Sequence, residues 1–365
     1  MKNNNCAAII IDTGFSREAI GLVRNLVAVA DLNTGMTRQG DPCLDHADDA
    51  VTGFAADPLN HGSLVLKALM AINEDLPVVL IRAYSDEVKL IRTGWRDGQI
   101  ASPGWTEAYL WAVDLLNKRG LASVTNCSFG GYTHAMDGTG WEAFSLGKVS
   151  GSGLPGHIVV AGAGAGDGRA LRASMAVGTG SSEQVLCRQM ESTTYNFWCR
   201  APADSDAGRS WSLNAYLEGR LVFSQQAGEV PGNIWNGRQQ STFTIDGAGQ
   251  VVFLVSRESD NDPEPAWFDC YINHQDQAVF LDHVNPSTIA EPAVFPGVIA
   301  VGLQKGSYCP GQTVPGAKPE VLLPGDGPVS FRLPEVTAAV AAWLCEEPGL
   351  DVDAVRARLG KYPRL

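Results

Sequence analysis

The sequence is poor in positive charge and lacks a long hydrophobic run. Its 365 residues contain 27 Lys and Arg against 40 Asp and Glu, which gives a formal net charge of −13. This charge repels phosphate backbones and anionic lipid surfaces, so we expect no nucleic-acid partner and no membrane partner. The apolar run at residues 7–11 is too short for the core of a secretion signal or for a membrane span. We therefore expect a cytoplasmic protein.

The eight cysteines include no Cys-x-x-Cys pair and no regular framework spacing. Several of them lie in apolar runs, which favours buried free thiols in a reducing compartment. A disulfide within residues 187–270 is the alternative.

The first half of the chain alternates short apolar runs with helical patterns. At 45% hydrophobic and 18% charged residues, the chain can bury one large core or two moderate ones. Buried-strand patterns occur at residues 7–12, 76–83, 122–131 and 157–164, and helical spacing occurs at 61–72 and 105–120. This alternation predicts an α/β fold with a mostly parallel sheet covered by helices on both faces.

Residues 171–288 show a different pattern, with period-two alternation and no helical spacing. Turn signals such as Glu218-Gly219 and Asp246-Gly247 separate the runs, which predicts an antiparallel β-sandwich or jelly roll. A buried-strand pattern returns at 295–302, so we interpret the β-rich block as an insertion into one α/β domain. The predicted segments are the first part of that domain at 1–170, the insertion at 171–288, and the second part at 289–365.

Three residues are candidates for catalysis. Asp12 ends a buried strand, where open parallel sheets place functional groups. His61 begins a helical pattern beside Gly62, and Ser330 precedes the last long helix, four residues before Pro334. Each of the three also has an ordinary reading as a turn residue or helix cap. Their order along the chain, Asp, His, Ser, is one of the orders in which a serine-protease triad is assembled.

Five segments around these residues resemble the subtilases, the subtilisin-like serine proteases. The segments are IIDTG at residues 10–14, HGSLV at 61–65, NCSFGG at 126–131, EPAVFPGVIAVG at 291–302 and SFRLP at 330–334. The resemblance implies a subtilisin-like parallel sheet and peptide-bond hydrolysis, with Ser330 as nucleophile, His61 as general base and Asp12 orienting the imidazole. It also implies that the backbone of six residues lines the peptide cleft: Ser128, Phe129, Gly130, Gly131, Gly162 and Gly164.

The sequence departs from the family pattern at two places. Aligning residues 156–164 on the family's oxyanion segment puts Ala165 where the family has an asparagine, and alanine has no side-chain donor. The residues Val329 and Phe331 around Ser330 are bulkier than is usual in the family. These departures favour a second hypothesis, a pseudoprotease that serves as a peptide-binding or regulatory scaffold.

The first hypothesis is an intracellular serine endopeptidase of restricted or precursor-processing specificity, acting on a peptide or protein substrate. The resemblance implies no catalytic metal and no cofactor, while a structural calcium ion is left open. Four acidic residues lie close together in the sequence: Asp41, Asp45, Asp48 and Asp49. Such a group favours a solvated loop, with cation binding as the alternative. The β-rich insertion could gate the cleft, dock a substrate, or bind a second copy or a regulatory partner.

Overall fold

The computed structural model describes residues 5–32, 57–83, 95–96, 99–100, 105–132, 136–164, 169–232, 236–258, 261–272, 277–286, 288–304 and 318–360. Ala165 and the acidic residues Asp41, Asp45, Asp48 and Asp49 lie outside these ranges.

Seven parallel strands form the sheet that carries the candidate site. Their order is β18-β17-β7-β6-β1-β3-β2. The strands are β1 (Cys6–Asp12), β2 (Leu26–Asp31), β3 (Val78–Arg82), β6 (Ala122–Cys127), β7 (His157–Gly162), β17 (Val298–Leu303) and β18 (Val321–Leu323). Because all pairs are parallel, the carboxyl ends of the neighbouring strands β7, β6 and β1 meet at one edge.

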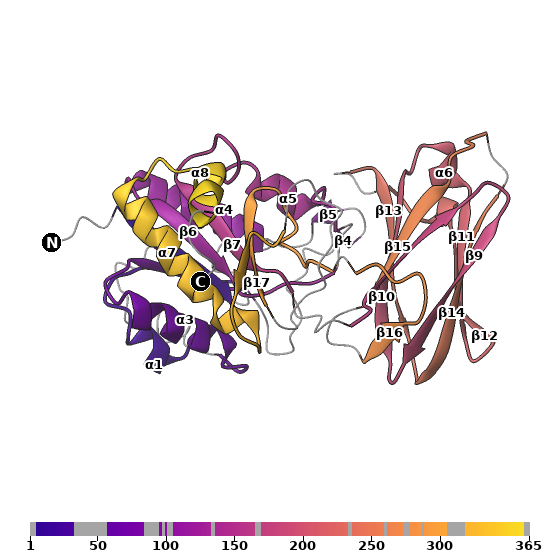
Figure 1. Cartoon of the computed structure of the whole chain (residues 1–365), viewed down its shortest axis with the longest axis horizontal. Helices are drawn as coiled ribbons and strands as arrows, with labels where there is room; N and C mark the ends of the chain where they lie inside the picture. The colour runs from indigo at the N-terminus through magenta and orange to yellow at the C-terminus, as the bar shows by residue number, and fades with distance from the viewer. Residues whose placement is uncertain are drawn as a thin grey trace.

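Helices cover both faces of this sheet (Figure 1). Successive residues of a strand point to opposite faces, so Ala8 and Ile10 pack on one side while Ile9 and Ile11 pack on the other. The first side holds α1 (Arg17–Ile20), α3 (His61–Ile72), α7 (Leu333–Glu346) and α8 (Val352–Leu359). The second side holds α4 (Trp105–Lys118) and α5 (Trp141–Leu146).

Two antiparallel sheets pack face to face in the β-rich part of the chain. One has the order β13-β10-β15-β8 and the other β12-β11-β14-β9-β16. The first contains β8 (Arg172–Val177), β10 (Thr193–Pro202), β13 (Arg238–Ile245) and β15 (Ala266–Ile272). The second contains β9 (Ser182–Gln189), β11 (Trp211–Leu217), β12 (Arg220–Gln226), β14 (Gly249–Arg257) and β16 (Ala278–Phe280). We call these two sheets the β-sandwich.

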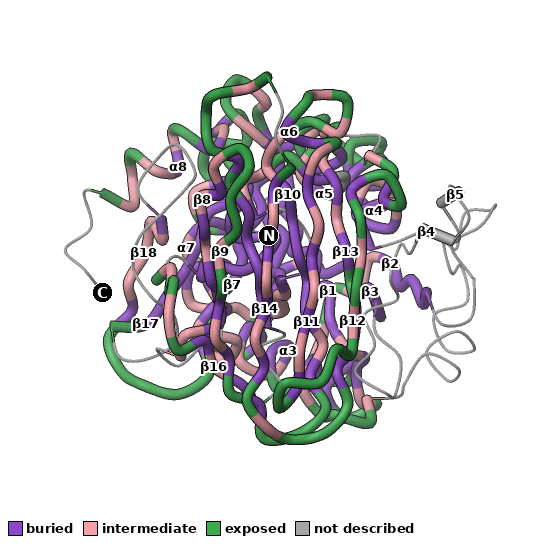
Figure 2. The backbone as a smooth tube through the Cα atoms, turned by 90° about the vertical axis from the view of Figure 1, so that its right-hand side faces the viewer, coloured by how far each residue is buried: buried purple, intermediate pink, exposed green. Residues whose placement is uncertain are grey.

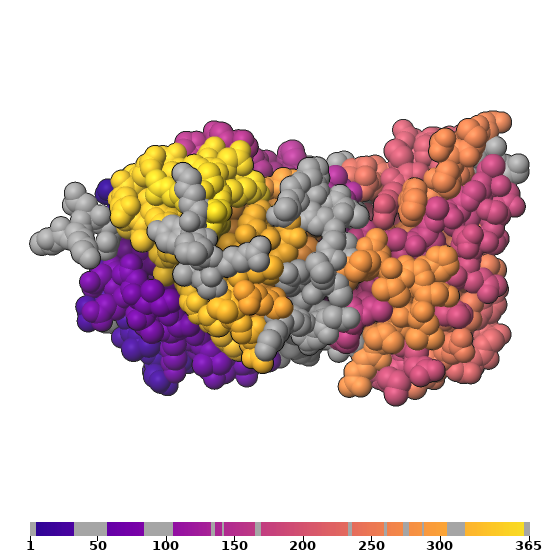
Figure 3. All heavy atoms as spheres, viewed as in Figure 1, coloured from indigo at the N-terminus to yellow at the C-terminus, as the bar shows by residue number. Residues whose placement is uncertain are grey.

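The inward-facing side chains of both sheets form one core. Buried and partly exposed residues alternate along β11 and β14 (Figure 2), as expected for strands with one face in a core. Short helices α6 (Asp206–Arg209) and η1 (Ala227–Glu229) lie between strands of the β-sandwich. The β-sandwich lies at one end of the molecule and α7 and α8 lie toward the other (Figure 3).

The predicted fold class, an α/β fold with a mostly parallel sheet and an inserted antiparallel β-sandwich, is wrong for the molecule as a whole. The two sheets of the β-sandwich, with the antiparallel pair β4 (Trp95–Arg96) and β5 (Gln99–Ile100), contain more strands than the parallel sheet. The described residues are a strand-rich mixture, with 39% in strands and 24% in helices. Residues 171–288 supply most of the antiparallel strands, and these strands outnumber those of the parallel sheet among the described residues. The segment boundaries at 170 and 288 stay a prediction.

All six cysteines in the described ranges are free thiols: Cys6, Cys127, Cys187, Cys199, Cys270 and Cys345. No disulfide therefore joins the three that lie within residues 187–270. Within the same ranges, no helix is both long and apolar enough to cross a membrane. The described His, Cys, Asp and Glu side chains include no group of three arranged to hold a metal ion.

Candidate active site

The candidate site begins where β1 ends and α3 starts. Asp12, the last residue of β1, is 1% exposed, and its Oδ1 lies 2.7 Å from Nδ1 of His61, the first residue of α3. The backbone N–H of Thr13 donates to the same oxygen at 2.7 Å. Asp12 Oδ2 is buried with no hydrogen-bond partner among the described residues. A buried carboxylate held in this way fixes the orientation of the imidazole.

Gly62 allows α3 to approach β1 this closely. A Cβ atom at residue 62 would lie 2.2 Å from the carbonyl oxygen of Gly14 and 2.9 Å from Cβ of Asp12. Both distances are too short for real atoms, so only glycine fits this position. The sequence pattern indicated a close approach at Gly62, and the partners of that approach are Asp12 and Gly14.

Asp57 joins the segment after β1 to the first turn of α3, and the sequence pattern did not predict it. Its Oδ1 accepts a hydrogen bond from Thr13 Oγ1 at 2.9 Å, and its Oδ2 accepts from the N and Oγ of Ser63 at 2.8 and 2.6 Å. Thr13 Oγ1 in turn accepts from the N–H of Gly62 at 3.2 Å. The only sequence signal for Asp57 is its place four residues before His61, next to a proline.

Two carboxylates act on the imidazole of His61. Burial disfavours the charged imidazolium and lowers the pKa, but the hydrogen bond to Asp12 and the charges of Asp12 and Asp57 outweigh burial. The pKa of His61 is therefore raised above its usual value. The ring is partly exposed, with 27% of its side-chain surface accessible, so it can reach a bound molecule.

Ser330 lies in the short 3₁₀ helix η2 (Val329–Phe331), just before α7. The ring centroid of the next residue, Phe331, is 5.4 Å from that of His61. Ser330 Oγ donates to the carbonyl oxygen of Ser128 at 3.0 Å. Its described hydrogen-bond partner is thus this carbonyl and not His61.

Two of the residues predicted to line the peptide cleft contact η2. Ser128 follows β6, and its Oγ lies 3.2 Å from the carbonyl oxygen of Ser330 and 2.8 Å from Asn126 Oδ1. Gly162 ends β7, and a Cβ there would lie 2.9 Å from Cγ1 of Val329. The ends of β6 and β7 therefore form the floor beneath η2.

The segment from Thr288 to Glu291 lies along the ends of β6 and β7. Ala290 N donates to Ala163 O at 2.9 Å, and Glu291 N donates to Gly131 O at 3.1 Å. These two carbonyl groups are thus occupied by the protein's own backbone. We call residues 288–291 the bridging segment.

Three further predicted cleft residues contact the bridging segment or the core. A Cβ at Gly130 would lie 2.9 Å from Cβ of Ala290, and one at Gly164 would lie 3.4 Å from the same atom. Phe129 instead packs edge-to-face on Trp105 of α4, with ring centroids 5.3 Å apart. The structure therefore places Ser128 beside Ser330, Gly162 beside Val329, and Gly130, Gly131 and Gly164 beside the bridging segment. Their roles in binding a peptide stay a prediction, as does the role of Ala165.

One of the solved structures that resemble this protein matches nearly the whole chain. The structure is similar to that of the CspB protease of Clostridium perfringens, with a TM-score of 0.67 and 13% sequence identity. The match covers 98% of this chain and 86% of that chain. At this identity, the similarity shows a fold shared with a protease and nothing finer.

Two other solved structures match with TM-scores too low to support an argument. One is the pre-peptidase C-terminal domain of collagenase from Bacillus anthracis, with a TM-score of 0.20 and 7% identity over 28% of this chain and 86% of that chain. The other is a cycloisomaltooligosaccharide glucanotransferase from Paenibacillus sp., with a TM-score of 0.17 and 10% identity over 79% of this chain and 47% of that chain.

The assignment to the subtilase family is corrected by these findings. No protein-family model matches the chain, and no curated protein matches it. The assignment also implied a subtilisin-like parallel α/β fold with an antiparallel insertion, whereas most strands of the described residues lie in antiparallel sheets. Short motifs can coincide while the rest of the chain differs, and here the motifs alone carried the family assignment.

Proposed function

We propose that the protein is a serine peptidase in which Ser330 is the nucleophile. The observation that carries the proposal is the 2.7 Å hydrogen bond between His61 Nδ1 and the buried carboxylate of Asp12. The residue after Ser330, Phe331, packs against the His61 ring, and this contact brings η2 to the pair. The similarity in fold to a protease supports the same reading.

The proposed reaction starts with rotation of the Ser330 side chain away from the Ser128 carbonyl and toward His61. The hydrogen bond to Asp12 holds the proton on Nδ1, which leaves Nε2 free to accept the hydroxyl proton. Ser330 Oγ then attacks the peptide carbonyl carbon, and the C–N bond breaks as His61 returns the proton to the leaving amine. Water releases the acyl group by the same steps in reverse order.

The proposed substrates are peptides or protein segments of restricted sequence. The bridging segment occupies the Ala163 and Gly131 carbonyl groups, so only part of each strand end can pair with a bound peptide. The net charge of −13 favours encounter with basic peptides. An intracellular location and precursor processing stay predictions, which cell fractionation and identification of cleaved proteins would test.

A second function, a peptide-binding scaffold without catalysis, is favoured by one observation. Ser330 Oγ is engaged by Ser128 O, and the Phe331 ring packs on the imidazole that would have to accept the proton. If this arrangement persists when a peptide is bound, the protein binds peptides without cleaving them.

A fluorophosphonate probe separates the two functions, because it reacts with serines that a neighbouring base activates. For a peptidase we expect labelling of the wild-type protein, complete loss in Ser330→Ala, and a loss of about 10³-fold or more in Asp12→Asn. The matched control is Ser150→Ala, since the Ser150 hydroxyl also donates to a backbone carbonyl, that of Gly297, away from the site. Labelling of Ser150→Ala must equal that of wild type.

A folded wild-type protein that stays unlabelled contradicts the peptidase proposal. Peptide binding by such a protein, measured by fluorescence anisotropy, would then support the scaffold.

A further inference from the structure

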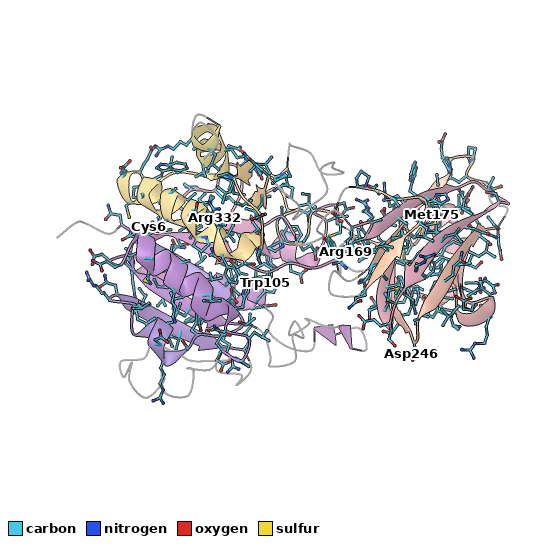
Figure 4. All side chains as sticks on the ribbon, turned by 60° about the horizontal axis from the view of Figure 1, so that its bottom comes forward. Cys6, Trp105, Arg169, Met175, Asp246 and Arg332 are labelled. Atoms are coloured by element: carbon cyan, nitrogen blue, oxygen red, sulfur yellow. The ribbon has the colours of Figure 1, made fainter. Side chains whose placement is uncertain are left out.

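A pocket of about 550 Å³ opens on the outer face of the β-sandwich. Its lining residues come from β8, from β15 and from the segment after β16: Ser174, Trp267, His283, Val284, Asn285 and Pro286. Met175, the residue after Ser174, lies in the β-sandwich (Figure 4) and is buried in its core. Because successive residues of a strand point to opposite faces, Ser174 points outward. The pocket shares no residue with the candidate active site.

Trp267 gives the pocket an exposed aromatic surface. It is 46% exposed, whereas its neighbours Ala266 and Phe268 are buried in the core. The guanidinium carbon of Arg200 lies 5.3 Å from the centroid of the Trp267 ring. Arg200 in turn donates through Nε and Nη2 to the carboxylate of Asp269, at 2.5 and 2.9 Å. Arg200 therefore holds the ring in one orientation although much of its surface is open to solvent.

The same carboxylate fixes the polar side chains of the pocket. Ser174 Oγ donates to Asp269 Oδ1 at 2.5 Å, and Asn285 Nδ2 donates to Ser174 Oγ at 3.0 Å. Asp269 itself is 1% exposed, so water does not compete for these bonds. His283, which is exposed, lines the same pocket. The fold thus sets a hydroxyl, an amide and an imidazole next to an exposed ring, as pre-formed ligand sites do.

An extended peptide cannot add a strand to the sheet at this pocket. β8 is the last strand of its sheet, so its outer edge is where a peptide would pair. That edge is already occupied by the chain itself. Ser174 N donates to His283 O at 2.9 Å, and Asn285 N donates to Arg172 O at 2.8 Å. A ligand of this pocket must therefore be recognised by side chains and not by backbone pairing.

We propose that this pocket binds a hexopyranose sugar of a glycan. A pyranose ring has a face of C–H groups that packs on an indole ring, and its hydroxyl groups bond with amide, imidazole and hydroxyl groups. Trp267 carries the sugar ring, and Asn285 and His283 bond its hydroxyl groups. A single sugar has about a dozen heavy atoms, so its Kd is on the order of 1 mM.

The test is an NMR titration of the full chain with isotope-labelled tryptophan, in which each indole N–H gives its own signal. The signal of Trp267 is assigned by its absence in Trp267→Phe. The probes are the methyl glycosides of glucose, galactose, mannose, N-acetylglucosamine and glucuronic acid, each added up to about 20 mM. We expect at least one of them to move the Trp267 signal saturably, with a Kd on the order of 1 mM.

The variants separate this pocket from other surfaces of the protein. Trp267→Ala should abolish the saturable binding, measured on the sugar signals by saturation-transfer NMR, and Asn285→Ala should weaken it about ten-fold. The matched control is Leu221→Ala, which removes an exposed apolar side chain from β12 in the other sheet and should bind as wild type does. Because Trp267 and Leu221 are both exposed, both variants should fold, and circular dichroism checks this.

Two results overturn the proposal. One is the lack of saturable binding by any of the glycosides, and the other is binding that is unchanged in Trp267→Ala. A polyproline peptide, which presents a preformed extended helix to aromatic side chains, is titrated in parallel. If it moves the Trp267 signal and no glycoside does, the pocket docks peptides and not glycans. None of these readouts depends on Ser330, so they test the pocket separately from the proposed peptidase.

Discussion

Gly62 is the residue at which the site tolerates no side chain. The added methyl of Gly62→Ala would overlap the Gly14 carbonyl and Cβ of Asp12, so α3 must move away from β1. We expect a loss of stability of about 1–3 kcal/mol, from overpacking, and a loss of fluorophosphonate labelling as His61 moves from Asp12. Urea unfolding and labelling of the same preparation measure the two effects.

The matched control for this prediction is Gly349→Ala. A Cβ at residue 349 would have no heavy atom within 4 Å, so stability should change little. If Gly62→Ala is as stable and as strongly labelled as Gly349→Ala, the close approach at Gly62 is not needed.

Asp57 acts on His61 through its charge. Asp57→Asn removes a negative charge that raises the pKa of His61, so that pKa should fall. Since only the neutral imidazole accepts a proton, the acid limb of the labelling profile should move to lower pH. A histidine whose pKa is raised by folding stabilises the protein below its unfolded pKa, and this contribution fades as pH rises through the folded pKa. The variant should therefore lose more stability at pH 5 than at pH 8.

The measurement for Asp57 is an NMR titration of the His61 ring alongside the labelling profile. The exposed Asp114→Asn, whose carboxylate pairs with Lys118 on α4, is the control that should leave both curves in place. An unchanged His61 titration in Asp57→Asn would show that the contact is structural only.

Local pattern predicted some residues of the candidate site and not others. Asp12 and His61 stand at the ends of strongly patterned elements, so their positions could be predicted. Asp57 could not, because its contact with Thr13 joins residues 44 positions apart and its loop carries no periodic signal. The hydrogen bond from Ser330 to Ser128 spans 202 positions and depends on a rotamer, which sequence does not encode locally.

At the scale of elements, long patterned segments were predicted well. Helical spacing over 61–72 agrees with the bounds of α3, and the pattern over 105–120 matches α4 to within two residues. The short strand β2 was missed, because a brief apolar run in this context does not separate strand from helix. The strands of the β-sandwich were indicated by their alternation, but their order across two sheets depends on pairings far apart in sequence.

Asp269 of β15 joins three strands of the β-sandwich. Its carboxylate accepts from Arg172 of β8, from Arg200 of β10 and from Ser174, and it is almost fully buried. Asp269→Asn leaves two arginines without their counter-charge. We expect a loss of about 3–5 kcal/mol at pH 7, measured by urea unfolding.

The effect of Asp269 should depend on pH. Burial favours the protonated acid, but the hydrogen bonds and charges of Arg200 and Arg172 outweigh it, so the pKa of Asp269 is lowered. The stability that ionised Asp269 contributes is fully present above the unfolded pKa of about 3.9. It is lost as pH falls through the lower folded pKa. The difference between wild type and Asp269→Asn should thus shrink in acid. The control is Asp246→Asn, at an exposed position of the β-sandwich (Figure 4). Its free energy of unfolding should equal that of wild type at every pH.

At the scale of the whole molecule, a few side chains connect the β-sandwich to the parallel-sheet part. Tyr132 stacks on Tyr271 of β15 with centroids 6.2 Å apart and an interplanar angle of 6°. Arg238 of β13 forms an ion pair with Asp137. The Tyr132 hydroxyl also donates to the Thr288 carbonyl at 2.9 Å, which links this contact to the bridging segment. The residues of each pair lie about a hundred positions or more apart, so no local pattern predicts them.

The stacked tyrosines and the Arg238–Asp137 ion pair should make the β-sandwich and the parallel-sheet part unfold together. We expect wild type to show one calorimetric transition, because the stacked ring and the ion pair couple the cores. The double variant Tyr132→Ala with Arg238→Ala removes both contacts, and its melting should split into two transitions about 5 °C apart or more. The control variant is Arg220→Ala. Arg220 lies on the exposed edge strand β12, away from both contacts, so this variant should keep one transition. A single transition in the double variant would contradict this prediction, because the coupling would then not depend on these two contacts.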